Sequence, residues 1–200
     1  GVDRAGIVAP DVDLTHVQSE IQHLEKLSTY GVTLQAGLQT KAEVLDLVQE
    51  GKTRLLHVAS HAQFNAKHPD ASPLMLYDAD LLPEDLDRRA IRQWRKAKPV
   101  VFFNACEAGR IEYKLTGLGG WADKFLRDVR ATAFVGTLWQ VNDALAAEFA
   151  MVFYDELLAG QTLGTACLRA RLHIKELAPA NPTWLAYTLY GDPNTVVAWG

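Results

Sequence analysis

Short apolar runs alternate with longer segments of mixed polarity along most of the chain. The short runs are rich in β-branched and aromatic residues, which is typical of buried strands. The longer segments repeat apolar residues every three or four positions, which is typical of helices that cover a sheet. This alternation predicts an α/β fold with a mostly parallel central sheet and helices on both faces. The expected strands of this sheet are at residues 5–10, 32–36, 54–60, 100–106 and 131–141.

The helical pattern predicts the elements that connect these strands. A β-excursion at 73–82 and an edge strand within 181–193 complete the expected order. No repeat or linker is evident, so we expect one domain over residues 1–200, and its start at Gly1 rather than Met suggests part of a larger protein. The expected helices are at residues 15–28, 40–51, 83–97, 121–128, 143–160 and 162–177.

Composition narrows the class of protein. With 48% hydrophobic and 22% charged residues, the chain is typical of a globular protein and not of a disordered one. The net charge of −4 disfavours a direct nucleic-acid partner. No apolar run approaches the ~20 residues of a membrane span and no signal peptide is evident, so we expect a cytoplasmic protein with no membrane partner. The two cysteines form no CxxC, and we expect neither a metal nor another cofactor.

Two residues with catalytic chemistry follow two of the expected strands. His61 comes directly after the strand at 54–60, and Cys106 ends the strand at 100–106. Reactive groups of parallel sheets gather at the carboxyl ends of the strands, so both residues are expected at one edge. A cysteine attacks an acyl carbon as the thiolate, and an imidazole can take up its proton and pass it to the leaving amine. Backbone N–H groups of Ala62 and Cys106 are the expected donors to the oxyanion.

Each residue taken alone also has a simpler interpretation. A cysteine after an apolar strand is usually a buried structural residue, and a histidine at such a position usually bonds a loop. Their conjunction is more specific, because His61 precedes Cys106 by 45 residues (106 − 61), near the caspase spacing of about 50. His57 within its apolar strand is expected to be a core histidine, and Cys167 within its helix a packing residue.

Several sequence blocks together resemble a known family. LLHVASHAQF, SPLMLYDADL, VVFFNACEAG, GLGGWADKFL, AFVGTLWQVND, VFYDELLAG and WLAYTLYGDP look like a CHAT domain, a branch of the caspase-like cysteine peptidases that also resembles separase. The resemblance implies a caspase-like three-layer sandwich, with His61 matching the catalytic histidine and Cys106 the nucleophile. Two positions depart from the family pattern: Ala62 stands where glycine is common, and the acidic Glu107 follows Cys106.

The same resemblance suggests a substrate pocket. LWQVND at 138–143 is similar to a separase block whose acidic residue helps to form the pocket for a basic P1 side chain. By this match Asp143 lines the S1 pocket and favours Arg or Lys, and Trp139 forms one wall. The alternative interpretation is that Asp143 is the N-cap of the helix that follows.

The function implied is a cysteine endopeptidase that cleaves specific partner proteins through an acyl-enzyme. CHAT domains usually accompany TPR or sensor domains, often in bacterial defence or programmed cell death, so activation by such a domain or by a ligand is expected. The alternative is a catalytically silent caspase-like scaffold, against which the presence of both His61 and Cys106 argues. A flavodoxin-like ligand-binding domain would explain the alternation but leave the positions of these two residues to coincidence.

Overall fold

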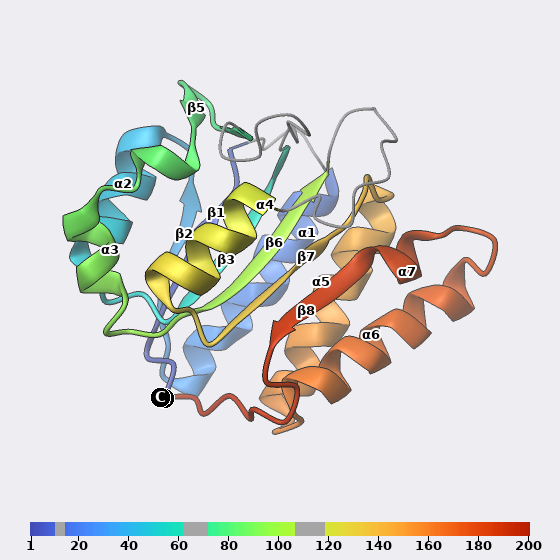
Figure 1. Cartoon of the computed structure of the whole chain (residues 1–200). Helices are drawn as coiled ribbons and strands as arrows, with labels where there is room; N and C mark the ends of the chain where they lie inside the picture. Colours follow the sequence, from blue (N-terminus) through green and yellow to red (C-terminus); the bar gives the residue numbers. More distant parts are fainter. Residues whose placement is uncertain (11–14, 62–71, 107–118) are drawn as a thin grey trace.

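A six-stranded sheet lies at the centre of the molecule, with helices on both of its faces (Figure 1). The structure is a computed structural model, and it describes residues 1–10, 15–61, 72–106 and 119–200. The strands have the order β2-β1-β3-β6-β7-β8, and all neighbours are parallel except the pair β7 and β8. The strands are β1 (Arg4–Val8), β2 (Thr33–Leu38), β3 (Leu55–His61), β6 (Val100–Cys106), β7 (Ala133–Thr137) and β8 (Tyr187–Gly191).

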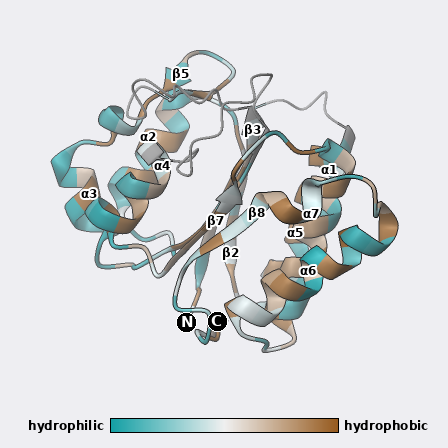
Figure 2. Ribbon diagram, turned by 45° about the vertical axis from the view of Figure 1, so that its right-hand side comes forward, coloured by the Kyte–Doolittle hydropathy of each residue, from teal (hydrophilic) through white to brown (hydrophobic). Residues whose placement is uncertain are grey.

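The helices form one layer on each face of the sheet, as Figures 1 and 2 show from two directions. On one face lie α1 (Thr15–Leu24), α5 (Asp143–Leu158) and α6 (Leu163–Leu177). On the other face lie α2 (Lys41–Glu50), α3 (Arg88–Trp94), α4 (Gly119–Asp123) and the π-helix η4 (Lys124–Val129). The predicted three-layer α/β sandwich is therefore confirmed.

Two separate apolar cores follow from the alternation of side chains along each strand. Phe102 belongs to the core under α1, α5 and α6, where its ring lies against that of Phe153 at 5.2 Å. The next residue, Phe103, belongs to the core under α2, α3 and η4, with Trp121 at 5.6 Å. The central strand β6 is thus buried on both faces, which accounts for its run of apolar residues from Val100 to Phe103.

Several predicted elements differ from the observed ones, and the helix expected at 121–128, for example, is α4 followed by the π-helix η4. The helix expected at 83–97 divides into the 3-10 turn η3 (Pro83–Asp85) and α3, because the Asp87 carboxylate caps α3 by accepting from the N–H groups of Arg89 and Ala90. The helix expected at 15–28 continues beyond α1 as the 3-10 helix η1 (Glu25–Tyr30). The strand expected at 131–141 is the shorter β7, because its pairing with β8 ends at Thr137 opposite Tyr187, beyond which the paired segment is the helix that ends at Ala186.

The remaining short elements lie at the ends of the sheet. The expected β-excursion is a hairpin of β4 (Leu74–Met75) and β5 (Asp80–Leu81), and α7 (Thr183–Ala186) precedes β8. The Ser60 hydroxyl donates to the carbonyl of Met75 at 2.7 Å and so ties β4 to the carboxyl end of β3. Within the described residues, no helix has the length and apolar character needed to cross a membrane.

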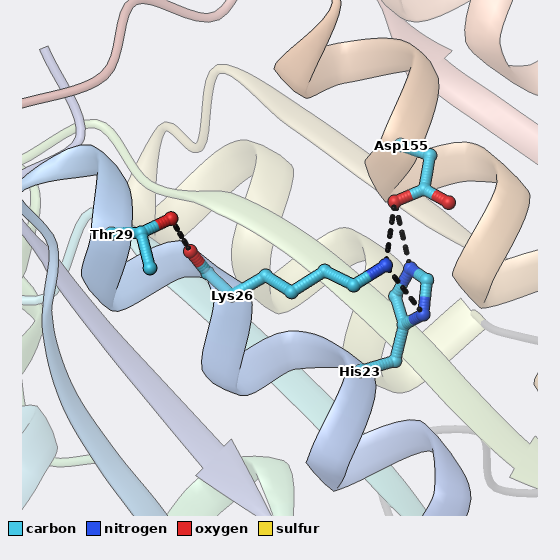
Figure 3. A network of polar contacts seen from close by, with 4 residues as sticks. All are labelled: His23, Lys26, Thr29 and Asp155. Atoms are coloured by element: carbon cyan, nitrogen blue, oxygen red, sulfur yellow. Dashed lines mark hydrogen bonds and ion pairs between the residues drawn. The ribbon is translucent and has the colours of Figure 1, made fainter.

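A polar cluster on the surface joins α1 and η1 to α5 (Figure 3). We call His23, Lys26 and Asp155 the outer network. His23 Nε2 lies 2.8 Å and Lys26 Nζ 3.5 Å from Asp155 Oδ1. About half of the Lys26 and Asp155 side-chain surfaces is exposed (53% and 52%), so this network is in contact with solvent.

Candidate active site

The backbones of His61 and Cys106 lie side by side at the carboxyl edge of the sheet. β3 and β6 pair in parallel over seven consecutive residue pairs, from Leu55 opposite Val100 to His61 opposite Cys106. Neighbouring strands of a sheet are about 4.8 Å apart. An unbroken register therefore brings together the two residues that sequence reasoning selected, whereas Ala62, the predicted oxyanion donor, lies outside the described residues.

The sheet opens on the other side of β6 at this same end. The pairing of β6 with β7 runs from Val100 opposite Ala133 to Phe103 opposite Gly136. The pairing with β3 continues three residues further, to Cys106. The last residues of β6 are thus held by one neighbouring strand, and the chain that follows β7 turns away from them toward α5.

The two predicted pocket residues lie in and after this turn. Trp139 is 41% exposed and Asp143 is partly buried at the first position of α5. The interpretation of Asp143 as the N-cap is wrong by one residue, because Asn142 is the cap and its Oδ1 accepts from the N–H of Leu145 at 3.1 Å. The cap requires an extended backbone, which Asn142 has (φ −75°, ψ 127°), and Asp143 is already helical.

A group of buried polar side chains, which we call the inner network, lies between β3 and β6 and the helices α1 and α5 that cover them. The carboxylate of Glu20 accepts from Asn104 Nδ2 at 2.9 and 3.1 Å. His57 Nε2 lies 3.1 Å from Glu20 Oε1, within ion-pair distance although not aligned as a hydrogen bond. The inner network consists of Glu20 on α1, His57 on β3, Asn104 on β6, Tyr154 on α5 and Tyr187 on β8.

Two tyrosines close the inner network. Tyr187 donates its hydroxyl to Asn104 Oδ1 at 2.7 Å, and the Tyr154 hydroxyl lies 3.0 Å from His57 Nδ1. Burial, reinforced by the negative charge of Glu20, raises the pKa of Tyr154 well above its ordinary value, so this phenol stays neutral. All members are 7% exposed or less. The expectation that His57 is a core histidine with polar partners is confirmed.

Sequence reasoning missed Glu20 and Asn104, although a signal was present. Val17, Glu20 and Leu24 share the i, i+3, i+7 spacing of one helix face, so the acidic residue interrupts the apolar stripe that packs on the sheet. Asn104 likewise stands among the apolar residues of β6. A polar residue at a buried position needs a hydrogen-bond partner, and these two residues are partners of each other.

Cys167 is the packing residue that its position predicts. It lies within α6 and is 5% exposed. Burial raises the pKa of its thiol to about 12, against a smaller opposing effect of Arg171. Within the described parts of the chain, no group of three or more His, Cys, Asp or Glu side chains is arranged to hold a metal ion.

Solved structures that share the fold of this chain include gingipain R and separase. The Arg-specific cysteine proteinase gingipain R, also solved as a complex of its pro- and mature domains from Porphyromonas gingivalis, superposes with a TM-score of 0.66 at 15% identity. Separase of Saccharomyces cerevisiae, in complex with securin, superposes with a TM-score of 0.57 at 15% identity. These matches cover 98% and 94% of this chain, but the chain spans only 48% of gingipain R and 12% of separase.

Sequence comparison gives the family. No curated protein matches the chain in sequence. The family model of the CHAT domain, however, matches residues 6–192, which include every strand of the sheet except the first two residues of β1. The chain shares its fold with gingipain R, and the register of β3 and β6 places the backbones of a histidine and a cysteine side by side at the carboxyl edge of the sheet. The chain belongs to the CHAT domain family.

Proposed function

We propose that this protein is a cysteine endopeptidase that uses His61 and Cys106 as a catalytic dyad. The observation that carries the proposal is the unbroken register of β3 and β6, which sets these two residues opposite each other. The fold shared with gingipain R, a cysteine proteinase, supports the same reaction class. A catalytically silent scaffold would need neither residue.

The reaction follows from the chemistry of the two side chains. The Cys106 thiolate attacks the peptide carbonyl, an S–C bond forms, and the carbonyl oxygen becomes an oxyanion that the N–H groups of Ala62 and Cys106 stabilise. His61 takes the thiol proton and gives it to the leaving amine as the C–N bond breaks. Water then attacks the acyl-enzyme with His61 as base, which releases the acid and restores the thiol.

The thiol chemistry is testable without knowing the substrate. We expect iodoacetamide to alkylate Cys106 at a rate whose pH midpoint is below the ordinary cysteine value of about 8.5, because an imidazolium stabilises the thiolate. His61→Ala should move this midpoint toward 8.5, and Cys167→Ala, the matched control, should leave it unchanged. An unperturbed midpoint that does not respond to His61→Ala would favour the scaffold.

We further propose that Asp143 and Trp139 line the S1 pocket and select a basic P1 side chain. Asp143 is an acidic residue just beyond the open end of the sheet, and gingipain R is described as Arg-specific. In a peptide library, cleavage after Arg or Lys should predominate in the wild type and fall ~10-fold or more in Asp143→Asn, since one charge-assisted contact is lost. Glu148→Gln, an equivalent change five residues further along α5, is the control. A preference for Ala or Leu would contradict the assignment.

Control by an associated domain or ligand is the last part of the proposal. The chain spans 48% of gingipain R and 12% of separase. The family resemblance further implies an associated TPR or sensor domain, since CHAT domains usually sit beside such domains, often in bacterial defence or programmed cell death. We expect the isolated domain to cleave a partner protein more slowly than the longer protein does with its stimulus. Equal rates for both would argue against such control.

A further inference from the structure

We infer that Glu20, His57 and Asn104 are positioning residues that hold the carboxyl ends of β3 and β6 in one arrangement. This inference rests on the proposed function, because those strand ends carry His61 and Cys106. None of the three residues is placed in the dyad itself. They affect His61 and Cys106 indirectly, by fixing the backbone positions of β3 and β6.

The first argument is that one carboxylate contacts both catalytic strands. Glu20 projects from α1 and accepts two contacts from the amide of Asn104, two residues before Cys106. Its Oε1 also lies 3.1 Å from Nε2 of His57, four residues before His61. α1 is thereby joined by polar contacts to β6 near its carboxyl end, at Asn104, and to the middle of β3, at His57.

The second argument is the position of Asn104 in its strand. The pairing of β6 with β7 reaches Phe103, so Asn104 is the first residue of β6 past that pairing. Its side chain provides other attachments at this point, because Nδ2 donates to Glu20 and Oδ1 accepts from Tyr187 at 2.7 Å. Tyr187 is itself immobilised, since its ring stacks on Phe149 with centroids 3.6 Å apart and planes 4° apart.

The third argument is the energy of a buried charge. Glu20 is 2% exposed, and a buried carboxylate is tolerated only when it is paired and hydrogen-bonded. Within the described residues, His57 is the basic side chain that lies within 4 Å of it. Because the neutral phenol of Tyr154 occupies Nδ1 of His57, the Nε2 edge is the one turned toward Glu20. A shift of β3 or of β6 relative to α1 would separate these partners, so the network penalises such shifts.

The experiment compares tyrosine variants on one strand. Tyr187→Phe removes the hydroxyl that donates to Asn104, and Tyr190→Phe makes the same change three residues further along β8, where the ring packs into the opposite core. Asn104→Leu and Glu20→Gln test the other contacts. For each protein, the pH dependence of Cys106 alkylation by iodoacetamide and the melting temperature are measured.

A positioning role predicts a change in reactivity that stability does not explain. We expect Tyr187→Phe to slow alkylation at pH 7 about threefold to tenfold and Asn104→Leu about tenfold or more, with midpoints displaced toward that of His61→Ala. Tyr190→Phe should leave rate and midpoint unchanged. A purely structural role predicts lower melting temperatures with wild-type rates and midpoints, and this result would overturn the inference.

Hydrogen exchange separates failure of this inference from failure of the proposed function. If the wild-type midpoint is ordinary and does not respond to His61→Ala, the dyad is refuted. The exchange rates of the backbone amides at the end of β6 would still show whether the inner network holds that strand end. Faster exchange there in Tyr187→Phe than in Tyr190→Phe would support positioning of the strand end. Equal exchange in both variants would overturn it, whatever the enzymatic activity.

Discussion

The inner and outer networks make a similar connection, one in the protein interior and the other at its surface. Both join α1 or its continuation to α5, both contain a histidine close to a carboxylate, and their α5 members, Tyr154 and Asp155, are adjacent in sequence. The outer network is in contact with water, which weakens its charges and satisfies any group left unpaired. The inner network excludes water, so each of its polar atoms depends on a protein partner. Similar residue types can therefore lose a partner at little cost at the surface, whereas in the interior each partner must stay in place.

The sharpest test of this contrast removes one carboxylate from each network. Glu20→Leu should lower the free energy of unfolding by about 3–5 kcal/mol, because His57 and Asn104 would remain buried without their partner. Asp155→Leu should cost at most about 1 kcal/mol, since its partners can turn to water. Urea unfolding at pH 7 measures both. Equal losses would mean that burial does not distinguish the networks.

Alkaline pH should destabilise the inner network through Tyr154. Because burial and the charge of Glu20 raise the pKa of Tyr154 in the folded protein, the unfolded chain loses this proton first, near pH 10. Stability should therefore fall as the pH rises above 10, by about 1.4 kcal/mol per pH unit for this group. Urea unfolding from pH 9 to 11 should show a shallower decline in Tyr154→Phe. Identical slopes would show that Tyr154 ionises freely in the folded state.

At neutral pH the same hydroxyl makes a smaller contribution. Tyr154→Phe should lower the free energy of unfolding by about 1 kcal/mol, the loss of one buried hydrogen bond to His57. Lys26→Ala in the outer network should cost less than about 0.5 kcal/mol. A tyrosine variant as stable as the wild type would indicate that Tyr154 and His57 are not bonded in solution.

Salt should produce the smallest difference. In 1 M NaCl the Debye length falls to about 3 Å, so the coupling energy between the Lys26 ammonium and the Asp155 carboxylate in a double-mutant cycle should drop toward zero. The Glu20–Asn104 coupling should be unchanged, because ions do not reach it. Loss of both couplings would contradict the burial of the inner network.

The sequence alone predicts much of this molecule where burial and periodicity agree. β6 is predicted at its observed bounds, 100–106, because a strand buried on both faces is predominantly apolar, here with Asn104 as the exception. The order of strands and helices followed from the same reasoning. The pairing of His61 with Cys106 could be anticipated because carboxyl ends of parallel strands share an edge.

What could not be predicted depends on contacts between distant segments. β7 ends at Thr137 although apolar residues continue, because its partner strand β8 begins at Tyr187 and the residues before it form α7. The cap at Asn142 and not Asp143 depends on a backbone angle that either residue type can adopt. Glu20 interrupts an apolar stripe in plain view, yet its partner Asn104 is 84 positions away. Local pattern identifies such a residue as unusual but does not identify what it contacts.

The span of the inner network also has a consequence for the order in which the chain matures. Its contacts join residues 84, 97 and 83 positions apart, and Tyr187 comes from the last strand of the sheet. Contacts of such high sequence separation form late in folding, since the intervening chain must first be ordered. A ribosome-bound chain that lacks β8 would carry His61 and Cys106 without the hydroxyl that fixes Asn104. Under the positioning inference, the nascent protein would acquire its reactive thiol only once nearly all of the domain has been synthesised.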